Sequence, residues 1–372
     1  MLSALAIFPA GARAQQSGVP PRITQAVDEG NRIVLAGNTH RLARAEFDRG
    51  VAPVNLSLAR MLLVLRRSPE QQAAVEALLA QQQNPSSPNY HQWLTPQQFG
   101  QRFGPAEQDV QTITSWLASH GFQVNRVANG RVVIEFSGTA GQLQDAFHAE
   151  IHKYQVNGKE HWANSSDPEI PAALAPVVAG IATIHNFRKV PQLIQSGQTV
   201  TAEYRPGVPP QLTFSSGKHA LGPQDFATIY DVNGAYSAGI NGSGTSIAVM
   251  GRSDFNSQDL IDFRNVFGLF GPYPQVYVDG PDPGDTGGDD EFEAVLDASW
   301  AGAVATSAGV TLVVSASTNT TDGVDLSELY IIDFDTAEIM TESYGSCEAG
   351  ATSAEATAKS ALAEQAAAEG IT

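Results

Sequence analysis

Hydrophobic and polar positions follow two different patterns along the chain, and the change between them divides it into two parts. From residue 46 to residue 189, apolar or β-branched runs alternate with segments of helical spacing. The run from Leu56 to Leu65 predicts a strand, and Ser68-Pro69 predicts the start of a helix to about Gln83. Two β-branched runs flank Asn129-Gly130, which predicts a hairpin. This mixed order of strands and helices indicates a compact α+β domain.

Residues 190–218 lose this periodicity and are rich in proline and glycine, which is typical of an exposed linker. Such a linker between two folded units is a natural place for cleavage. Residues 15–45 are polar and contain glycine, so we expect a loose lead-in to the first domain.

A new pattern begins near Leu221, where buried-type strands alternate with helices. A glycine-rich turn at residues 242–245 precedes a predicted strand to Gly251. Further strands are predicted at residues 275–278 and 310–315, an extended segment at 338–343, and helices at 257–267, 289–305, 325–332 and 352–369. The alternation indicates an α/β domain with a mostly parallel sheet over residues 219–372. Gly370 would lead into another strand, so we expect this domain to be incomplete at Thr372.

Composition narrows the class of protein. The chain has 21 Lys plus Arg against 39 Asp plus Glu, a formal net charge of −18, which argues against a nucleic-acid-binding protein. The same charge agrees with a secreted protein that stays soluble at mildly acidic pH. Residues 1–14 form an apolar run that ends in Ala-x-Ala, as in a signal peptide, although its basic start is missing. No later stretch has 18 uninterrupted apolar residues, so we expect no membrane span.

Two carboxylates provide the candidate chemistry. Glu293 and Asp297 lie four residues apart in a predicted helix and therefore share one of its faces. Two like charges at this spacing destabilise a helix by about a few tenths of a kcal/mol. If the two groups are partly desolvated, one pKa rises, which suits proton transfer at acidic pH. The alternative is a solvated acidic helix start favoured by the helix dipole.

Three stretches together resemble the sedolisin family, the serine-carboxyl peptidases, which are made as proenzymes with a kumamolisin-type activation domain. The first runs from Asn84 to Pro105 and contains Tyr90-His91-Gln92-Trp93-Leu94. The second is Ile184-His185-Asn186-Phe187-Arg188, at the end of the first domain. The third is the Glu293/Asp297 helix with Trp300, where the family carries its catalytic Glu and Asp. Ser343-Tyr344-Gly345 also resembles the family's Ser-aromatic-Gly segment.

The resemblance implies a ferredoxin-like activation domain with an antiparallel sheet, followed by part of a subtilisin-like α/β catalytic domain. It also implies a Ser-Glu-Asp triad, in which Glu293 is the general base and Asp297 orients it. The family's nucleophile lies in a Gly-Thr-Ser segment, but Gly244-Thr245-Ser246 here matches the opening strand instead. We therefore expect the nucleophile, and the ligands of the calcium ion that the family binds, beyond Thr372. Glu348 is a candidate for the family's oxyanion aspartate, with a surface charge as the alternative.

The remaining candidate residues have less specific interpretations. The histidines show no metal-ligand spacing, and the aspartates of residues 282–290 do not match a calcium loop, so we expect a solvated acidic segment. Cys347 is the single cysteine, and we interpret it as half of a disulfide whose partner lies outside this chain.

These observations predict a secreted, acid-acting serine-type endopeptidase proenzyme. Its substrates would be proteins or peptides, and its activation domain would be an intramolecular inhibitor. The 372-residue chain alone is expected to be inactive, because it lacks the nucleophile. The alternative is a non-catalytic secreted binding or peptidase-inhibitory protein.

Overall fold

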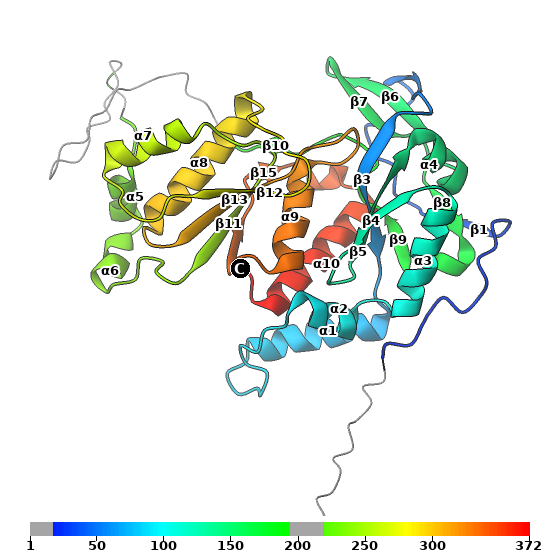
Figure 1. Cartoon of the computed structure of the whole chain (residues 1–372), viewed down its shortest axis with the longest axis horizontal. Helices are drawn as coiled ribbons and strands as arrows, with labels where there is room; N and C mark the ends of the chain where they lie inside the picture. The colour runs from blue at the N-terminus through cyan, green and yellow to red at the C-terminus, as the bar shows by residue number, and fades with distance from the viewer. Residues whose placement is uncertain (1–17, 194–216, 218) are drawn as a thin grey trace, which may run out of the picture.

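The computed structural model describes residues 18–193, 217 and 219–372. Two sheets and the helices around them form five layers, which Figure 1 shows from right to left. Helices α3 and α4 cover an antiparallel sheet, α9 and α10 lie between that sheet and a parallel one, and α7 and α8 cover the parallel sheet's far face. The predicted signal peptide at residues 1–14 and most of the predicted linker lie outside the described residues.

The antiparallel sheet is the centre of the N-terminal domain (residues 18–189). Its strands, in sheet order, are β4 (Gln123–Val127), β5 (Val133–Thr139), β3 (Ser57–Leu65) and β9 (Val178–Ile181). The apolar run of β3 is almost continuously buried because helices cover both faces of this sheet. The predicted strand at Leu56–Leu65 is confirmed, and its central Leu63 pairs with both Ile134 and Ile181.

The first helix of this domain begins where Ser68-Pro69 predicts, and three more follow it. They are α1 (Pro69–Gln82), α2 (Pro96–Phe103), α3 (Glu107–Ser119) and α4 (Ala140–Phe147). Ser68, Thr95 and Thr139 each cap a helix through a reciprocal bond with a glutamine three residues later. Trp116, Phe136 and Phe147 form the core between α3, α4 and the sheet.

The lead-in is more ordered than predicted. β1 (Arg32–Val34) pairs with β8 (Glu169–Pro171), and Ile23 and Leu35 join the domain's core. A second small sheet contains β2 (Asp48–Val51), β6 (Ile151–Val156) and β7 (Lys159–Asn164), and a 3-10 turn (Ala172–Leu174) precedes β9. The expectation of a loose lead-in over residues 15–45 is therefore wrong for its described part, because its few apolar side chains cover the sheet's edge.

The C-terminal domain (residues 219–372) contains the predicted parallel sheet. In sheet order its strands are β12 (Gln275–Val278), β13 (Gly309–Val314), β11 (Ser246–Gly251) and β14 (Ile339–Thr341), and every pair is parallel. Its helices are α5 (Pro223–Ile229), α6 (Val232–Ser237), α7 (Ser257–Phe267), α8 (Gly288–Val304), α9 (Gly323–Phe334) and α10 (Ser353–Glu369). After Gly370, the backbone of Thr372 bonds to Glu338 and Met340 beside β14, as the predicted next strand would.

The helices between the two sheets join the domains through a shared core. Leu326, Leu329 and Ile332 of α9 and five buried apolar residues of α10 pack with Leu62 and Val64 of β3. Chain patterning gives each domain its own apolar faces but does not indicate that these faces meet. An antiparallel sheet followed by a parallel α/β sheet is confirmed, and among the described residues no helix is long and apolar enough to cross a bilayer.

Candidate active site

Helix α8 presents the two predicted carboxylates at the edge of the parallel sheet. The helix begins after Gly287, whose φ of 68° favours glycine, and its first turn carries three acidic residues. Ala294 and Ala298 pack on the sheet, so the adjacent face holds Glu293 and Asp297 against the protein. Glu293 is only 2% exposed, and Asp297 is half-buried. The alternative of a fully solvated acidic helix start does not fit these two residues.

Burial changes the proton affinity of both groups. Desolvation, and next the charge of Asp297, raise the pKa of Glu293, although Leu193 N–H and the Ser343 hydroxyl oppose the shift. Desolvation also raises the pKa of Asp297, again against Ser343. Glu293 Oε2 and Asp297 Oδ2 are buried with no hydrogen-bond partner among the described residues. Both carboxyl groups therefore hold a proton more tightly than a solvated carboxyl group does, and each has an oxygen that can accept a further hydrogen bond.

Several chain segments converge on the carboxylate pair at one end of the parallel strands. Arg252 follows β11 directly, α8 follows β12, and Ser343 lies just after β14. The carboxyl ends of parallel strands are where α/β sheets usually bind ligands. Ser246, by contrast, starts β11 at the opposite end, where its backbone and hydroxyl bond to Glu338.

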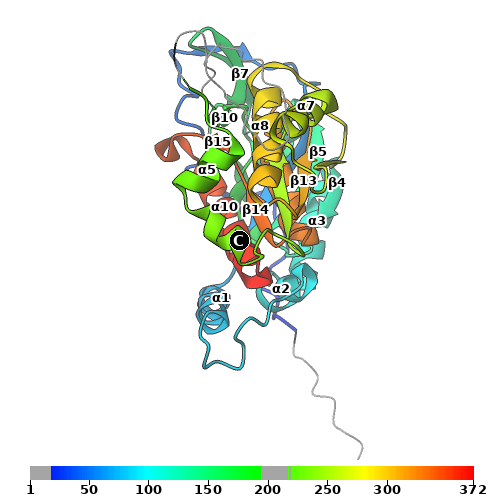
Figure 2. The same cartoon turned by 90° about the vertical axis from the view of Figure 1, so that its left-hand side faces the viewer.

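The segment that leaves the N-terminal domain crosses this site as a strand. β10 (Val190–Pro191) pairs antiparallel with β15 (Tyr344–Gly345), and Gln192 N donates to Ser343 O at 2.9 Å. Figure 2 shows β10 and β15 beside α8. The N–H groups of Gln192 and Leu193 both lower the pKa of Glu293, so the peptide bond between them lies at the carboxylate pair. The described start of the predicted linker is therefore paired rather than free.

Arg252 fixes the surroundings of the pair and was not singled out from the sequence. Its guanidinium is bidentate to Asp290 in the first turn of α8, at 3.0 and 2.8 Å. It also donates to Asp322, the N-cap of α9, and lies 4.9 Å from the Tyr344 ring centre. The prediction that the acidic segment is solvated is thus wrong for Asp290. A lone arginine directly after a buried strand was the available signal.

The other candidate residues lie outside the carboxylate pair. Glu348 is exposed on a 3-10 turn (Glu348–Gly350), and no described contact joins it to Glu293, so its oxyanion role stays a prediction. Cys347 is an exposed free thiol within this chain. Within residues 18–193, 217 and 219–372, no group of three or more potential ligands is arranged for a metal.

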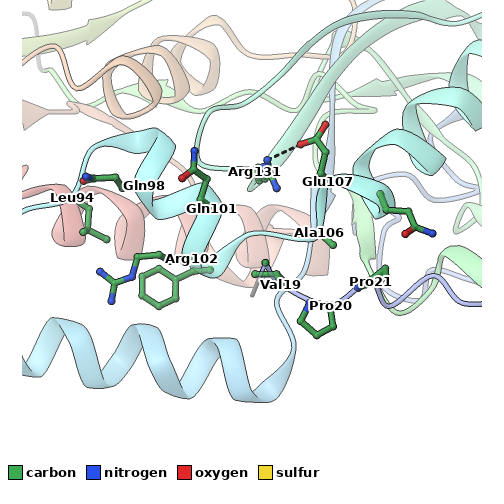
Figure 3. Close-up of a pocket in the computed structure, with 13 residues that line it drawn as sticks. Val19, Pro20, Pro21, Leu94, Gln98, Gln101, Arg102, Ala106, Glu107 and Arg131 are labelled. Carbon is green, nitrogen blue, oxygen red and sulfur yellow. Dashed lines mark hydrogen bonds and ion pairs between the residues drawn. The ribbon is translucent and has the colours of Figure 1, made fainter. Parts of the chain in front are cut away.

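An open depression elsewhere on the molecule does not involve the site. It lies between α2, the start of α3 and the segment around Val19, and Figure 3 shows Arg131 paired with Glu107 at its margin. Neither carboxylate of the pair lines it.

Comparison with known proteins gives concordant matches. Residues 48–187 match the family described as pro-kumamolisin, activation domain. The chain is 26% identical to sedolisin from Pseudomonas sp. (strain 101) over 280 residues, which cover 73% of this chain and 46% of the relative. It is 30% identical over 219 residues to xanthomonalisin from Xanthomonas sp. (strain T-22), covering 58% and 25%. It is 24% identical over 300 residues to kumamolisin from Bacillus sp. (strain MN-32), covering 78% and 51%. The chain thus spans about half, or less, of the length of these relatives.

Proposed function

The chain belongs to the sedolisin family of serine-carboxyl peptidases, and from that membership we propose that its protein is a secreted, acid-acting serine-type endopeptidase proenzyme. Its substrates are proteins or peptides. The strand order of the activation domain, β4-β5-β3-β9 with helices after β3 and β5, supports a ferredoxin-like fold, and the all-parallel second sheet supports a subtilisin-like one.

One observation carries the proposal: a desolvated carboxylate pair lies against a peptide strand that is held by backbone pairing. Glu293 acts as general base to a serine nucleophile, which the family pattern puts beyond Thr372. Asp297 orients Glu293 and stabilises the proton it takes up, as the buried Asp does for His in a serine-protease triad. A carboxylate base works at acidic pH, at which a histidine is protonated and cannot accept a proton.

Ser343 is assigned a positioning role rather than the role of nucleophile. Its hydroxyl lowers the pKa of both Glu293 and Asp297 and so favours their charged forms. Its backbone carbonyl meanwhile accepts from Gln192 of the connecting strand. One residue therefore links the carboxylate pair to the bound peptide. Calcium stays an expectation from the family, and no step is assigned to it.

The activation domain is an intramolecular inhibitor in this proposal. The connecting strand occupies the same backbone sites along β15 that a protein substrate needs. Because the bond between Gln192 and Leu193 lies at Glu293, self-processing begins with that bond, within the predicted region from Val190 to Leu221.

The test uses the full-length protein, shifted to acid and assayed on a denatured protein. Glu293→Gln and Asp297→Asn are each expected to lower kcat by about 10³-fold or more. N-terminal sequencing of the acid-treated protein should find a new terminus at Leu193, which the Glu293→Gln variant fails to produce. Ser343→Ala is expected to lose far less activity, with a shifted pH profile.

Glu291→Gln is the matched control, because it removes the same charge from the first turn of α8 and lies outside the pair. Near-native turnover by a correctly folded Glu293→Gln variant would contradict the assignment. A full-length protein that degrades nothing in acid, but binds a peptidase or another protein, would favour the non-catalytic alternative.

A further inference from the structure

Lys189 is the last residue of the activation domain, which is the N-terminal domain described above. Its side chain is nevertheless buried in the C-terminal domain, which is the peptidase domain of the proposal. Its ammonium lies 2.7 Å from Asp325 Oδ1, in the first turn of α9, and 2.7 Å from Glu342 Oε1, directly after β14. Only 20% of the side chain is exposed. A lysine is seldom buried to this extent without paired carboxylates, so these contacts form a specific site for a cation.

The charge around Lys189 is strongly unbalanced without it. Four carboxylates, which we call the acidic cluster, surround this point: Asp322, Asp325, Glu328 and Glu342. Three of them accept from Lys189, and Glu328 shares Lys359 with Glu342. Two cations of the peptidase domain face them. Lys359 pairs with Glu328 and Glu342 at 2.9 and 2.7 Å, and Arg252 pairs with Asp322 while also neutralising Asp290. The peptidase domain therefore keeps an excess of negative charge at this point.

The electrostatic effect on Lys189 agrees with this imbalance. Burial alone lowers the pKa of Lys189, but the charges of Asp325, Glu342 and Glu328 outweigh burial and raise it. The ammonium therefore stays charged in the cluster. A neutral side chain in its place leaves buried carboxylates uncompensated, and that costs more than losing an exposed ion pair.

Backbone groups of Lys189 and of the strand after it form hydrogen bonds that do not depend on which side chains the strand carries. Lys189 N donates to Asp322 Oδ2 at 3.2 Å, and Lys189 O accepts from Arg252 Nη1 at 3.0 Å. Further along, the strand pairs with β15, and Gln192 N donates to Ser343 O. In peptide recognition by strand addition, such main-chain bonds supply affinity and side-chain sites supply specificity. Any extended peptide in this register places one side chain in the acidic cluster.

We propose that the acidic cluster is a substrate subsite that selects a lysine or arginine three residues before the residue whose carbonyl is attacked. Lys189 and Gln192 of the connecting strand stand in for those two substrate positions. The inference rests on the proposed peptidase function and names the substrate class of that site. Once the activation domain has left, the cluster faces an incoming peptide that makes the same backbone bonds.

The experiment determines which bonds the acid-matured, full-length protein cleaves in a denatured protein, by mass spectrometry of the products. Lys and Arg are expected to be enriched at the third residue before the cleaved carbonyl. Two synthetic peptides copy residues 186–197, one with Lys189 and one with Gln at that position. The Lys peptide should be cleaved with a kcat/KM about 10- to 100-fold higher.

Glu342→Gln is expected to reduce this ratio to within about threefold, because a lysine at this position then loses one of its two carboxylate partners. Glu364→Gln is the matched control, since Glu364 lies on α10 and pairs with Arg67 of the activation domain, away from the cluster. Cleavage of the denatured protein with no enrichment, and equal rates for the two peptides, overturns the subsite. Absence of any proteolysis would instead contradict the proposed function itself.

Discussion

The two faces of the activation domain's antiparallel sheet are covered in different ways. One face packs on α3 and α4 of the same domain, with Trp116 and Phe147 in a core that needs nothing else. The other face carries Leu62 and Val64, which pack with α1 and α2 of the same domain and with α9 and α10 of the C-terminal domain. The activation domain can therefore complete only one of its cores by itself. The second core is complete only while both domains are folded and in contact (Figure 1).

Charge distinguishes the two faces as well. In each ion pair that joins the described parts of the two domains, the activation domain supplies the basic side chain and the C-terminal domain the carboxylate. These pairs are Arg60–Asp279, Arg67–Glu364, Arg126–Asp333, His185–Glu355, Lys189–Asp325 and Lys189–Glu342. The face covered by α3 and α4 depends mainly on apolar burial. We call the face that packs against α9 and α10 the shared face. The stability of the shared face therefore depends on pH, and that of the face covered by α3 and α4 depends on pH much less.

The largest expected effect comes from a matched pair of leucines on the two faces. Leu143→Ala, at a fully buried site on the inner face of α4, should cost about 2–5 kcal/mol of unfolding free energy in the fragment 18–193 and in the whole chain. Leu62→Ala should cost a similar amount in the whole chain but only about 1 kcal/mol in the fragment, where α9 and α10 are missing. Denaturant unfolding of both lengths measures this. Equal costs in the fragment would show that the two faces do not differ.

A smaller effect, a gain in stability instead of a loss, is expected when Glu369 is substituted. This residue of α10 is only 5% exposed. Burial, and further the charges of Asp335 and Asp333, raise its pKa to about 8. The folded state then holds this proton more tightly than the unfolded state, so stability falls as pH rises from about 4.5 to about 8. Glu369→Gln should stabilise the chain by roughly 2 kcal/mol at pH 8 and hardly at all at pH 4.

Thermal unfolding at the two pH values tests the Glu369 prediction. Glu364→Gln is the control on the same helix, since it removes a carboxylate paired with Arg67 and should give no gain at pH 8. An equal gain from Glu369→Gln at both pH values would mean that ionisation of Glu369 is not the cause.

The smallest expected effect is acid weakening of the shared face. Burial raises the pKa of Glu355, but the hydrogen bond and charge of His185 outweigh it and lower the pKa. A carboxyl group whose pKa is lowered on folding stabilises the folded state at pH values above its pKa in the unfolded chain. This stabilisation is lost as the pH falls through its pKa in the folded state. Glu355→Gln should therefore cost about 1 kcal/mol at pH 7 and less at low pH.

Amide hydrogen exchange distinguishes the faces in the same experiment. Acidification should speed exchange in α9 and α10 more than in α3 and α4. Glu160→Gln is a fitting control, because its pair with Lys153 lies within the small sheet of the activation domain. Faster exchange in α3 and α4 would contradict the link between acid and the shared ion pairs.

The local elements of this protein could be predicted from sequence because their causes are local. Ser68, Thr95 and Thr139 bond to backbone and glutamine within one turn, so the helix starts follow from neighbouring residues. The helix at residues 257–267 and the strand at 275–278 coincide with α7 and β12, since periodicity and flanking glycines act over a few positions. The spacing of Glu293 and Asp297 likewise follows from one helix.

Tertiary structure decided what surrounds that pair. The contacts that do so join residues from about 40 to more than 250 positions apart in the chain. They are those of Arg252 with Asp290 and Asp322, of Lys189 with Asp325 and Glu342, and of Leu62 with α9. No local pattern encodes such contacts, since each partner alone is an ordinary surface charge or core leucine. Sequence by itself determined which faces are apolar and where two carboxylates share a helix. Only packing decided which apolar faces meet, and packing excluded the water that would otherwise leave Glu293 an ordinary acid.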